Sequence, residues 1–202
     1  MAHSERERIL DLADWPERAT AYVCSLSLGK KPIHPMYGLE REEIRAWLAV
    51  RPPSLAAMLE SLTAQRAGRV GAPRWVEKTP RHLEVPELIV DTWPHARIVR
   101  IVRDPRDAAV SLTKVPFGTP SLLTNLSVLA RMNAAAAAFY RQSPLALTVR
   151  YAVLVSAPER ELRRICEFVK VDYEAGMPDD RSGATGVAAA HEWWKGDATG
   201  PL

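Results

Sequence analysis

The stretch Arg97–Leu112, RIVRIVRDPRDAAVSL, decides the fold that this sequence predicts. Its first half is built from β-branched apolar residues with few polar interruptions, which is typical of a strand in a buried parallel sheet. A burst of charge follows around an Asp-Pro pair, and the chain then continues into small residues that favour a helix and carry Ser111. The stretch therefore predicts a strand, a loop and a helix, with the charged residues at the carboxyl end of the strand.

Apolar spacing and turn residues predict the neighbouring elements in the same way. The segments expected to be helical share apolar residues on one face, for example Leu39, Ile44, Trp47 and Leu48. They are residues 39–51, 54–66 beginning at the Ser54 cap, 86–94 ending before Pro94, 120–141 after the Thr119–Pro120 start, and 157–169. Further strands are expected at RWVEKTP (74–80) and LALTVRY (145–151). Strands separated by helices predict an α/β fold, a mainly parallel sheet with helices on both faces.

Composition predicts one globular domain spanning residues 1–202. The chain is 47% hydrophobic and 25% charged, and it shows no internal repeat and no clear linker. No apolar run approaches the ~20 residues of a membrane helix, so we expect a soluble, cytoplasmic protein. Cys24 and Cys166 belong to no C-x-x-C pair, which favours reduced core thiols over a zinc site or a disulfide.

The chain carries a formal net charge of +3 and a pI near 9.0. Its arginines are spread along the predicted helices and strands, with no basic run and no aromatic-basic alternation, so no nucleic-acid partner is expected. Small anionic ligands explain the basic balance equally well.

The layout of Arg97–Leu112 predicts an anion site. In open parallel sheets, ligands bind beyond the carboxyl ends of the strands, where a loop and a helix start present backbone N–H groups. Arg103 would leave the strand pointing into that crevice and hold a phosphate through two parallel hydrogen bonds, and Ser111 would add a hydroxyl. The alternative is structural: Arg103 pairs with Asp104 or Asp107, and Ser111 is a packing residue.

Four segments together resemble a known family. WVEKTPRHL, RIVRIVRDPRDAAVSL, VRYAVLV and ELRRICEFV are similar to sulfotransferases that use 3′-phosphoadenosine 5′-phosphosulfate, over roughly Trp75–Val169, and AAAHEWWKG extends the likeness. The resemblance implies a P-loop-NTPase-like core and transfer of a sulfuryl group from that co-substrate to a hydroxyl or amine of a small-molecule, glycan or lipid acceptor. It implies no metal.

The resemblance also implies roles for individual residues. The arginine that opens R-D-P-R-D and the serine eight residues later bind the 3′-phosphate in that family, which assigns these roles to Arg103 and Ser111. Tyr151 in VRYAVLV matches a tyrosine that contacts the adenosine half of the co-substrate. The acidic residue that usually follows it is Ala152 here, and an aromatic residue closing a strand is also ordinary core.

The family lysine beside the transferring sulfuryl group corresponds to Lys78, whose ammonium would stabilise charge on the bridging oxygen. The alternative is a surface lysine at a strand end. The usual histidine base falls on Pro80, so His82 is the nearest substitute and Glu77 is the other candidate. An imidazole acts as a base near neutral pH with little change in its pKa, whereas Glu77 would need a raised pKa. This difference favours His82 as the base over Glu77. The alternative that His82 is only a packing residue stays open.

One part of the family pattern is missing. The strand and glycine loop that wrap the 5′-phosphosulfate, P-K/R-S-G-T-T in form, are not found before Trp75, and no G-x-x-x-x-G-K exists in the chain. YVCSLSLGKK (22–31) and RSGATG (181–186) imitate the loop without its strand and helix context. We therefore expect a core truncated at both ends, natural or as a fragment, with a non-catalytic nucleotide-binding protein as the alternative function.

Two further expectations concern the segments before Lys78. If residues 20–28 form a strand beside Arg103, they supply a substitute loop; if they are helical, weak nucleotide binding and no transfer are expected. The acceptor pocket is expected at Trp47 and Trp75, which are equally suited to a core.

Overall fold

The computed structural model describes residues 10–28, 30–115 and 118–179. The chain divides into two compact units, Met1–Lys78 and Thr79–Leu202.

The first unit is mainly helical. Its core consists of buried aliphatic residues from three helices and the loop before α3, including Val23, Leu39, Ile44, Leu48 and Met58. The elements are η1 (Leu12–Asp14), α2 (Glu17–Ser25), β1 (Ser27–Leu28), β2 (Lys31–Pro32), η2 (His34–Tyr37), α3 (Arg41–Ala49), α4 (Leu55–Glu60) and α5 (Thr63–Arg69). β1 pairs with β2 as an antiparallel hairpin.

Local signals predicted two features of this unit correctly. Leu39, Ile44 and Leu48 are completely buried, and Trp47 packs against the same core. The Ser54 hydroxyl accepts a hydrogen bond from the Ala57 amide at 3.0 Å and so caps α4, as expected from the sequence.

The second unit is built on two parallel strands. β3 (Ile98–Val102) pairs with β4 (Ala146–Arg150), from Ile98 opposite Ala146 to Val102 opposite Arg150. The connection between them contains α7 (Pro105–Leu112), α8 (Leu122–Ala135) and α9 (Ala137–Gln142). η3 (Pro80–Glu84) and α6 (Pro86–Thr92) precede the strands, and α10 (Tyr151–Ser156) and α11 (Pro158–Val169) follow them.

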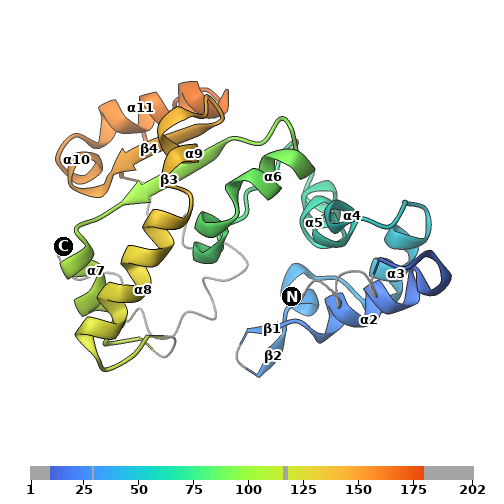
Figure 1. Cartoon of the computed structure of the whole chain (residues 1–202). Coiled ribbons are helices and arrows are strands. Elements are labelled where there is room, and N and C mark those ends of the chain that lie inside the picture. Colours follow the sequence, from blue (N-terminus) through green and yellow to red (C-terminus); the bar gives the residue numbers. More distant parts are fainter. Residues whose placement is uncertain (1–9, 29, 116–117, 180–202) are drawn as a thin grey trace. The chain divides into compact units, whose positions relative to one another are not determined.

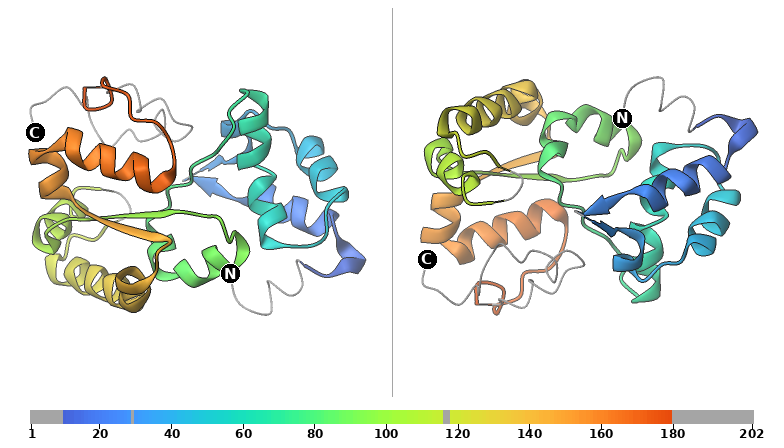
Figure 2. Two further views of the ribbon diagram at one scale, coloured as in Figure 1. Left: turned by 90° about the horizontal axis from the view of Figure 1, so that it is seen from above. Right: turned by 90° about the horizontal axis from the view of Figure 1, so that it is seen from below.

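Helices cover both faces of this small sheet. α11 lies on one side of β3 and β4 and α8 on the other, and this arrangement is the same in all three views (Figures 1 and 2). α9 and α11 both contact β4, and α7 packs along α8. The predicted α/β class, a parallel sheet between helices, is therefore confirmed, although the sheet is smaller than the sequence led us to expect.

Three predicted elements differ from the structure. The single helix expected over 54–66 is interrupted at Ser61 and Leu62 and forms α4 and α5. RWVEKTP forms no strand: residues 74–79 have no regular secondary structure, and Val76 is 92% exposed. A strand needs a neighbouring strand for its backbone groups, and in the described residues this segment is paired with none. The helix expected over 120–141 starts later, at the Ser121 cap, and is interrupted at Ala136, so it forms α8 and α9.

The segment considered as a substitute phosphate loop is also settled within the described residues. Tyr22–Ser25 belongs to α2, and Ser27–Pro32 contains the β1–β2 hairpin, so no strand leads into a loop and a helix there. Gly29, RSGATG and AAAHEWWKG lie outside the described residues.

Both cysteines are free thiols, with Cys166 buried in α11 and Cys24 half-buried in α2, as expected for core thiols. Across the described ranges, no helix combines the length and the apolar character needed to cross a membrane.

Candidate functional site

Arg103 stands at the carboxyl end of β3, directly after Val102. The strand ends there because Asp104 and Pro105 begin α7: Pro105 is suited to the first helical position, and the Asp104 carboxylate accepts a hydrogen bond from the Arg106 amide at 2.9 Å. The chain therefore turns immediately after Arg103, whose side chain is 48% exposed. This is the position that the sequence predicts for an anion-binding arginine.

Asp104 is engaged with Arg106 rather than with Arg103. Its carboxylate accepts hydrogen bonds from the Arg106 Nε at 3.0 Å and Nη2 at 2.6 Å. These side-chain hydrogen bonds, with the backbone amide of Arg106, lower the pKa of Asp104 to about 2. One of the two structural alternatives for Arg103 is thus not formed.

Tyr151 holds the equivalent place after β4. It is the first residue of α10 and follows Arg150, the residue paired with Val102. Because the two strands are parallel and in register, the residues that leave them are neighbours, and the Arg103 guanidinium carbon lies 5.0 Å from the centre of the Tyr151 ring. A cation at this distance from an aromatic face is attracted to it. The structure therefore brings together two of the residues to which the resemblance gives a role in nucleotide binding.

Asp107 is the acidic neighbour of Arg103. Its Oδ2 lies 3.8 Å from the Arg103 Nε, and its side chain is 62% exposed. The second structural alternative, an ion pair between Arg103 and Asp107, is therefore present, as a loose and solvent-exposed contact. An anion that binds Arg103 has to compete with this carboxylate.

Ser111 lies in the last turn of α7 and is exposed. The buried residue of that helix is Ala109, and α7 packs along α8, so Ser111 is not the packing residue of the helix. Ser111 and Asp107 are four residues apart and share one helix face.

Asn125 fixes α7 to its surroundings. This buried side chain donates to the Ala109 carbonyl at 3.3 Å and the Thr119 carbonyl at 2.9 Å, and it accepts from the Thr119 amide at 3.2 Å. The sequence analysis did not single it out. An asparagine at helical spacing from the apolar residues Leu122, Leu129 and Met132 is the signal that could have identified it.

The candidate catalytic residues belong to different units. Glu77 and Lys78 lie in the irregular segment at the end of the first unit, and His82 lies in η3 of the second. Both η3 and α7 pack against α8. His82 in η3 and Ser111 in α7 therefore lie on two elements that contact the same helix. The role of Lys78 beside the transferring sulfuryl group remains a prediction, and so does the choice between His82 and Glu77 as base.

Tyr37 is a neighbour of Glu77 that the sequence analysis missed. Burial raises the pKa of the Tyr37 phenol, and the negative charge of Glu77 raises it further. Trp47, considered for the acceptor pocket, packs on the core of the first unit with the Arg51 guanidinium 3.4 Å from its ring centre. Trp75 is half-buried.

The arrangement defines an α/β protein with an arginine and a tyrosine side by side beyond two parallel strands. Residues 6–175 match the sequence model described as the sulfotransferase family, so the chain belongs to that family. No curated protein and no solved structure matches the chain. Over the part of the chain that the structure covers, no group of three or more His, Cys, Asp or Glu residues is placed to hold a metal ion.

Proposed function

We propose that this chain is a sulfotransferase that uses 3′-phosphoadenosine 5′-phosphosulfate as its donor. Family membership supports transferase activity in general. Our proposal adds the donor and the roles of individual residues. It also adds the acceptor, a hydroxyl or amine on a small molecule, glycan or lipid.

One observation carries it: Arg103 and Tyr151 meet at the carboxyl ends of β3 and β4, with the guanidinium 5.0 Å from the ring centre. A nucleotide that carries a 3′-phosphate offers a dianion to the guanidinium and a flat ring system to the tyrosine. Arg103 suits the phosphate because its planar fork forms two parallel charge-assisted hydrogen bonds. The exposed Ser111 on α7 supports the same site as a hydroxyl donor.

The co-substrate supplies an activated sulfuryl group when it is bound. In our proposal Arg103 and Ser111 hold the 3′-phosphate and Tyr151 contacts the adenosine. Lys78 stabilises negative charge beside the reacting group, and His82, or alternatively Glu77, accepts the acceptor proton. Holding two reactants in line accounts for most catalysis of this type, because there is little covalent chemistry for the protein to perform.

A second candidate function is nucleotide binding without transfer. The observation that favours it is the helix and hairpin formed by Tyr22–Ser25 and Ser27–Pro32, where a substitute phosphate loop was considered. Arg103 and Tyr151 would then bind a 3′-phosphorylated nucleotide with no partner for its 5′ end from that segment. Under this second function, weak nucleotide binding and no measurable transfer are expected from this chain alone.

Calorimetry with 3′-phosphoadenosine 5′-phosphate, together with a radiolabelled transfer assay over a panel of hydroxyl and amine acceptors, separates the two functions. Arg103→Met should weaken nucleotide binding about tenfold or more, because a charge-assisted hydrogen bond is lost. Arg131→Met on the exposed face of α8 is the matched control and should leave binding unchanged. Nucleotide binding without sulfuryl transfer supports the second function. If Arg103→Met leaves the affinity for the nucleotide unchanged, both functions are refuted.

A further inference from the structure

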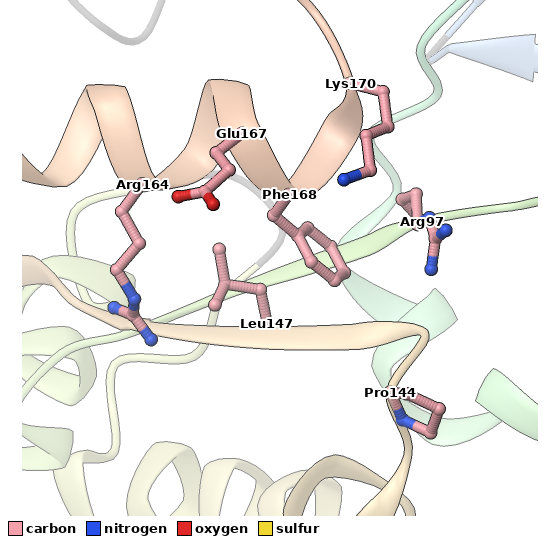
Figure 3. Close-up of a pocket in the computed structure, with 7 residues that line it drawn as sticks. All are labelled: Arg97, Pro144, Leu147, Arg164, Glu167, Phe168 and Lys170. Atoms are coloured by element: carbon pink, nitrogen blue, oxygen red, sulfur yellow. The ribbon is translucent and has the colours of Figure 1, made fainter.

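A pocket of about 350 Å³ opens at the end of the parallel strands opposite Arg103 and Tyr151. It is lined by residues just before β3, at the start of β4 and at the end of α11: Arg97, Pro144, Leu147, Arg164, Glu167, Phe168 and Lys170 (Figure 3). Arg97 and Arg103 are six residues apart along an extended segment, which is about 20 Å at the usual rise. The pocket is therefore distinct from the nucleotide site proposed above.

The rim of this pocket carries two cations, Arg97 and Lys170, that have no carboxylate partner in the described part of the chain. Among the described residues, neither Arg97 nor Lys170 takes part in an ion pair. Arg97 instead has its guanidinium carbon 5.7 Å from the centre of the Phe168 ring. The Arg97 and Lys170 side chains both extend to the side of the pocket where Phe168 lies (Figure 3).

The third cation is held in place. The Arg164 guanidinium bonds to Glu161 Oε2 at 3.0 Å and to the Thr148 carbonyl at 3.3 Å. Arg164 is thus already neutralised, whereas Arg97 and Lys170 are available for an incoming anion.

Lys170 has a backbone conformation that is uncommon for its residue type. It ends α11 at φ 60° and ψ 53°, in the left-handed region where glycine is usual. The amides of Lys170 and Val171 bond to the Glu167 and Cys166 carbonyls and close the helix. A lysine here keeps an ammonium beside the pocket and beside the negative end of the helix, where a glycine would close the helix with less strain.

The floor of the pocket is apolar. Leu147 and the half-buried Phe168 face the cavity, and Pro144 lies at its edge (Figure 3). A flat ring suits this floor, because aromatic groups pack against one another in offset or edge-to-face contacts. A volume of 350 Å³ lies within the range of about 300–1,000 Å³ that is usual for small-molecule sites.

We propose that this pocket is a second anion site, which binds a small aromatic anion: an aryl phosphate, sulfate or carboxylate. Its charged group binds between Arg97 and Lys170, and its ring packs on Phe168 and Leu147. Glu167 faces the same cavity and favours ligands that add a hydrogen-bond donor on the ring. This proposal does not depend on the donor or the chemistry of the site at Arg103.

Titration of the full chain with phenyl phosphate, followed by NMR, tests the proposal. Shifts should concentrate at Leu147, Phe168 and Lys170. Inorganic phosphate and phenol, the two halves of the probe, should each bind more weakly than phenyl phosphate. Arg97→Gln and Lys170→Asn should each weaken binding about threefold, the size expected for one exposed ionic contact, and the double variant about tenfold. Asparagine tolerates the left-handed conformation at position 170.

Two control variants test whether the probe occupies this pocket. Arg131→Gln, on the exposed face of α8, should bind phenyl phosphate as the unmodified chain does. Arg103→Met should also leave binding unchanged; if it removes binding, the probe occupies the nucleotide site and the proposal is wrong. Unaltered affinity of the Arg97→Gln variant, which keeps Lys170 and its helix end intact, or equal binding of inorganic phosphate, would likewise overturn it.

Discussion

Replacing Asp107 by asparagine should strengthen binding of 3′-phosphoadenosine 5′-phosphate. The Asp107 carboxylate lies 3.8 Å from the Arg103 guanidinium, and it shares a face of α7 with Ser111. It therefore stands between the two residues proposed to hold the 3′-phosphate. Asparagine keeps the shape of the side chain and removes the charge.

The expected gain follows from the geometry of the ion pair. At 3.8 Å, two unit charges in water attract each other by about 1 kcal/mol. The two side chains are 48% and 62% exposed, which reduces the net contribution to roughly 0.2–1 kcal/mol. In the Asp107→Asn variant there is no ion pair to break when the nucleotide binds, and no carboxylate to repel its 3′-phosphate. The affinity for the nucleotide should therefore rise about twofold to tenfold.

Calorimetry at low and high salt measures this effect. The gain should shrink at high salt, because exposed charges are screened. Asp107→Glu retains the charge and Asp172→Asn removes an exposed acid elsewhere in the same unit, so neither should increase affinity. Helix α7 loses an acidic residue from its first turn in the Asp107→Asn variant, so circular dichroism has to show that it remains folded. Equal or weaker nucleotide binding by a folded Asp107→Asn protein would refute the competition between Asp107 and phosphate.

Three further predictions concern single side chains. Tyr37 should titrate above the ordinary tyrosine pKa in an ultraviolet titration, and Glu77→Gln should remove only part of the increase, because burial is the larger cause; a return to the ordinary value would contradict this order of causes. Because the pKa of Asp104 is lowered to about 2, its charge should stabilise the fold fully above the ordinary pKa of about 3.9. This contribution should be lost as the pH falls toward 2. The free energy of unfolding of Asp104→Asn should therefore depend less steeply on pH over that interval. Asn125→Ala should lower the free energy of unfolding by about 1–3 kcal/mol in urea, because buried backbone groups of Ala109 and Thr119 lose their partner; an unchanged midpoint would contradict this.

The parts of the fold that were predictable depend on neighbours in sequence. The apolar face of α3, the Ser54 cap and the strand–loop–helix of Ile98–Leu112 all follow from residues within a few positions of one another. The failed strand at RWVEKTP shows the limit of such signals. Its composition suits a strand, but whether it becomes one depends on a partner that local sequence does not reveal.

The candidate site divides in the same way. Arg103 was predictable because Asp104 and Pro105 mark the end of its strand in the sequence. Tyr151 was assigned only by the resemblance to the family, and the parallel pairing of β3 with β4 makes the two residues neighbours. The sequence could not predict whether Asp104 or Asp107 contacts Arg103. The outcome depends on the hydrogen bonds that the Arg106 guanidinium donates to the Asp104 carboxylate. Tyr37 and Glu77 are forty residues apart in the sequence, so no local pattern predicts that Glu77 acts on the Tyr37 phenol.

The register of β3 on β4 has a consequence for how this protein tolerates change. Arg103 and Tyr151 each lie one residue beyond a five-residue ladder that starts at Ile98 and Ala146. Inserting or deleting one residue inside either strand would turn the following side chain to the opposite face of the sheet, while the apolar content of the strand would hardly change. The connection between α7 and α8 imposes no such constraint, because loops accept added residues at small entropic cost. Length variation in this second unit should therefore be found in the connections, with the two short strands held at constant length by the proposed nucleotide site rather than by the core.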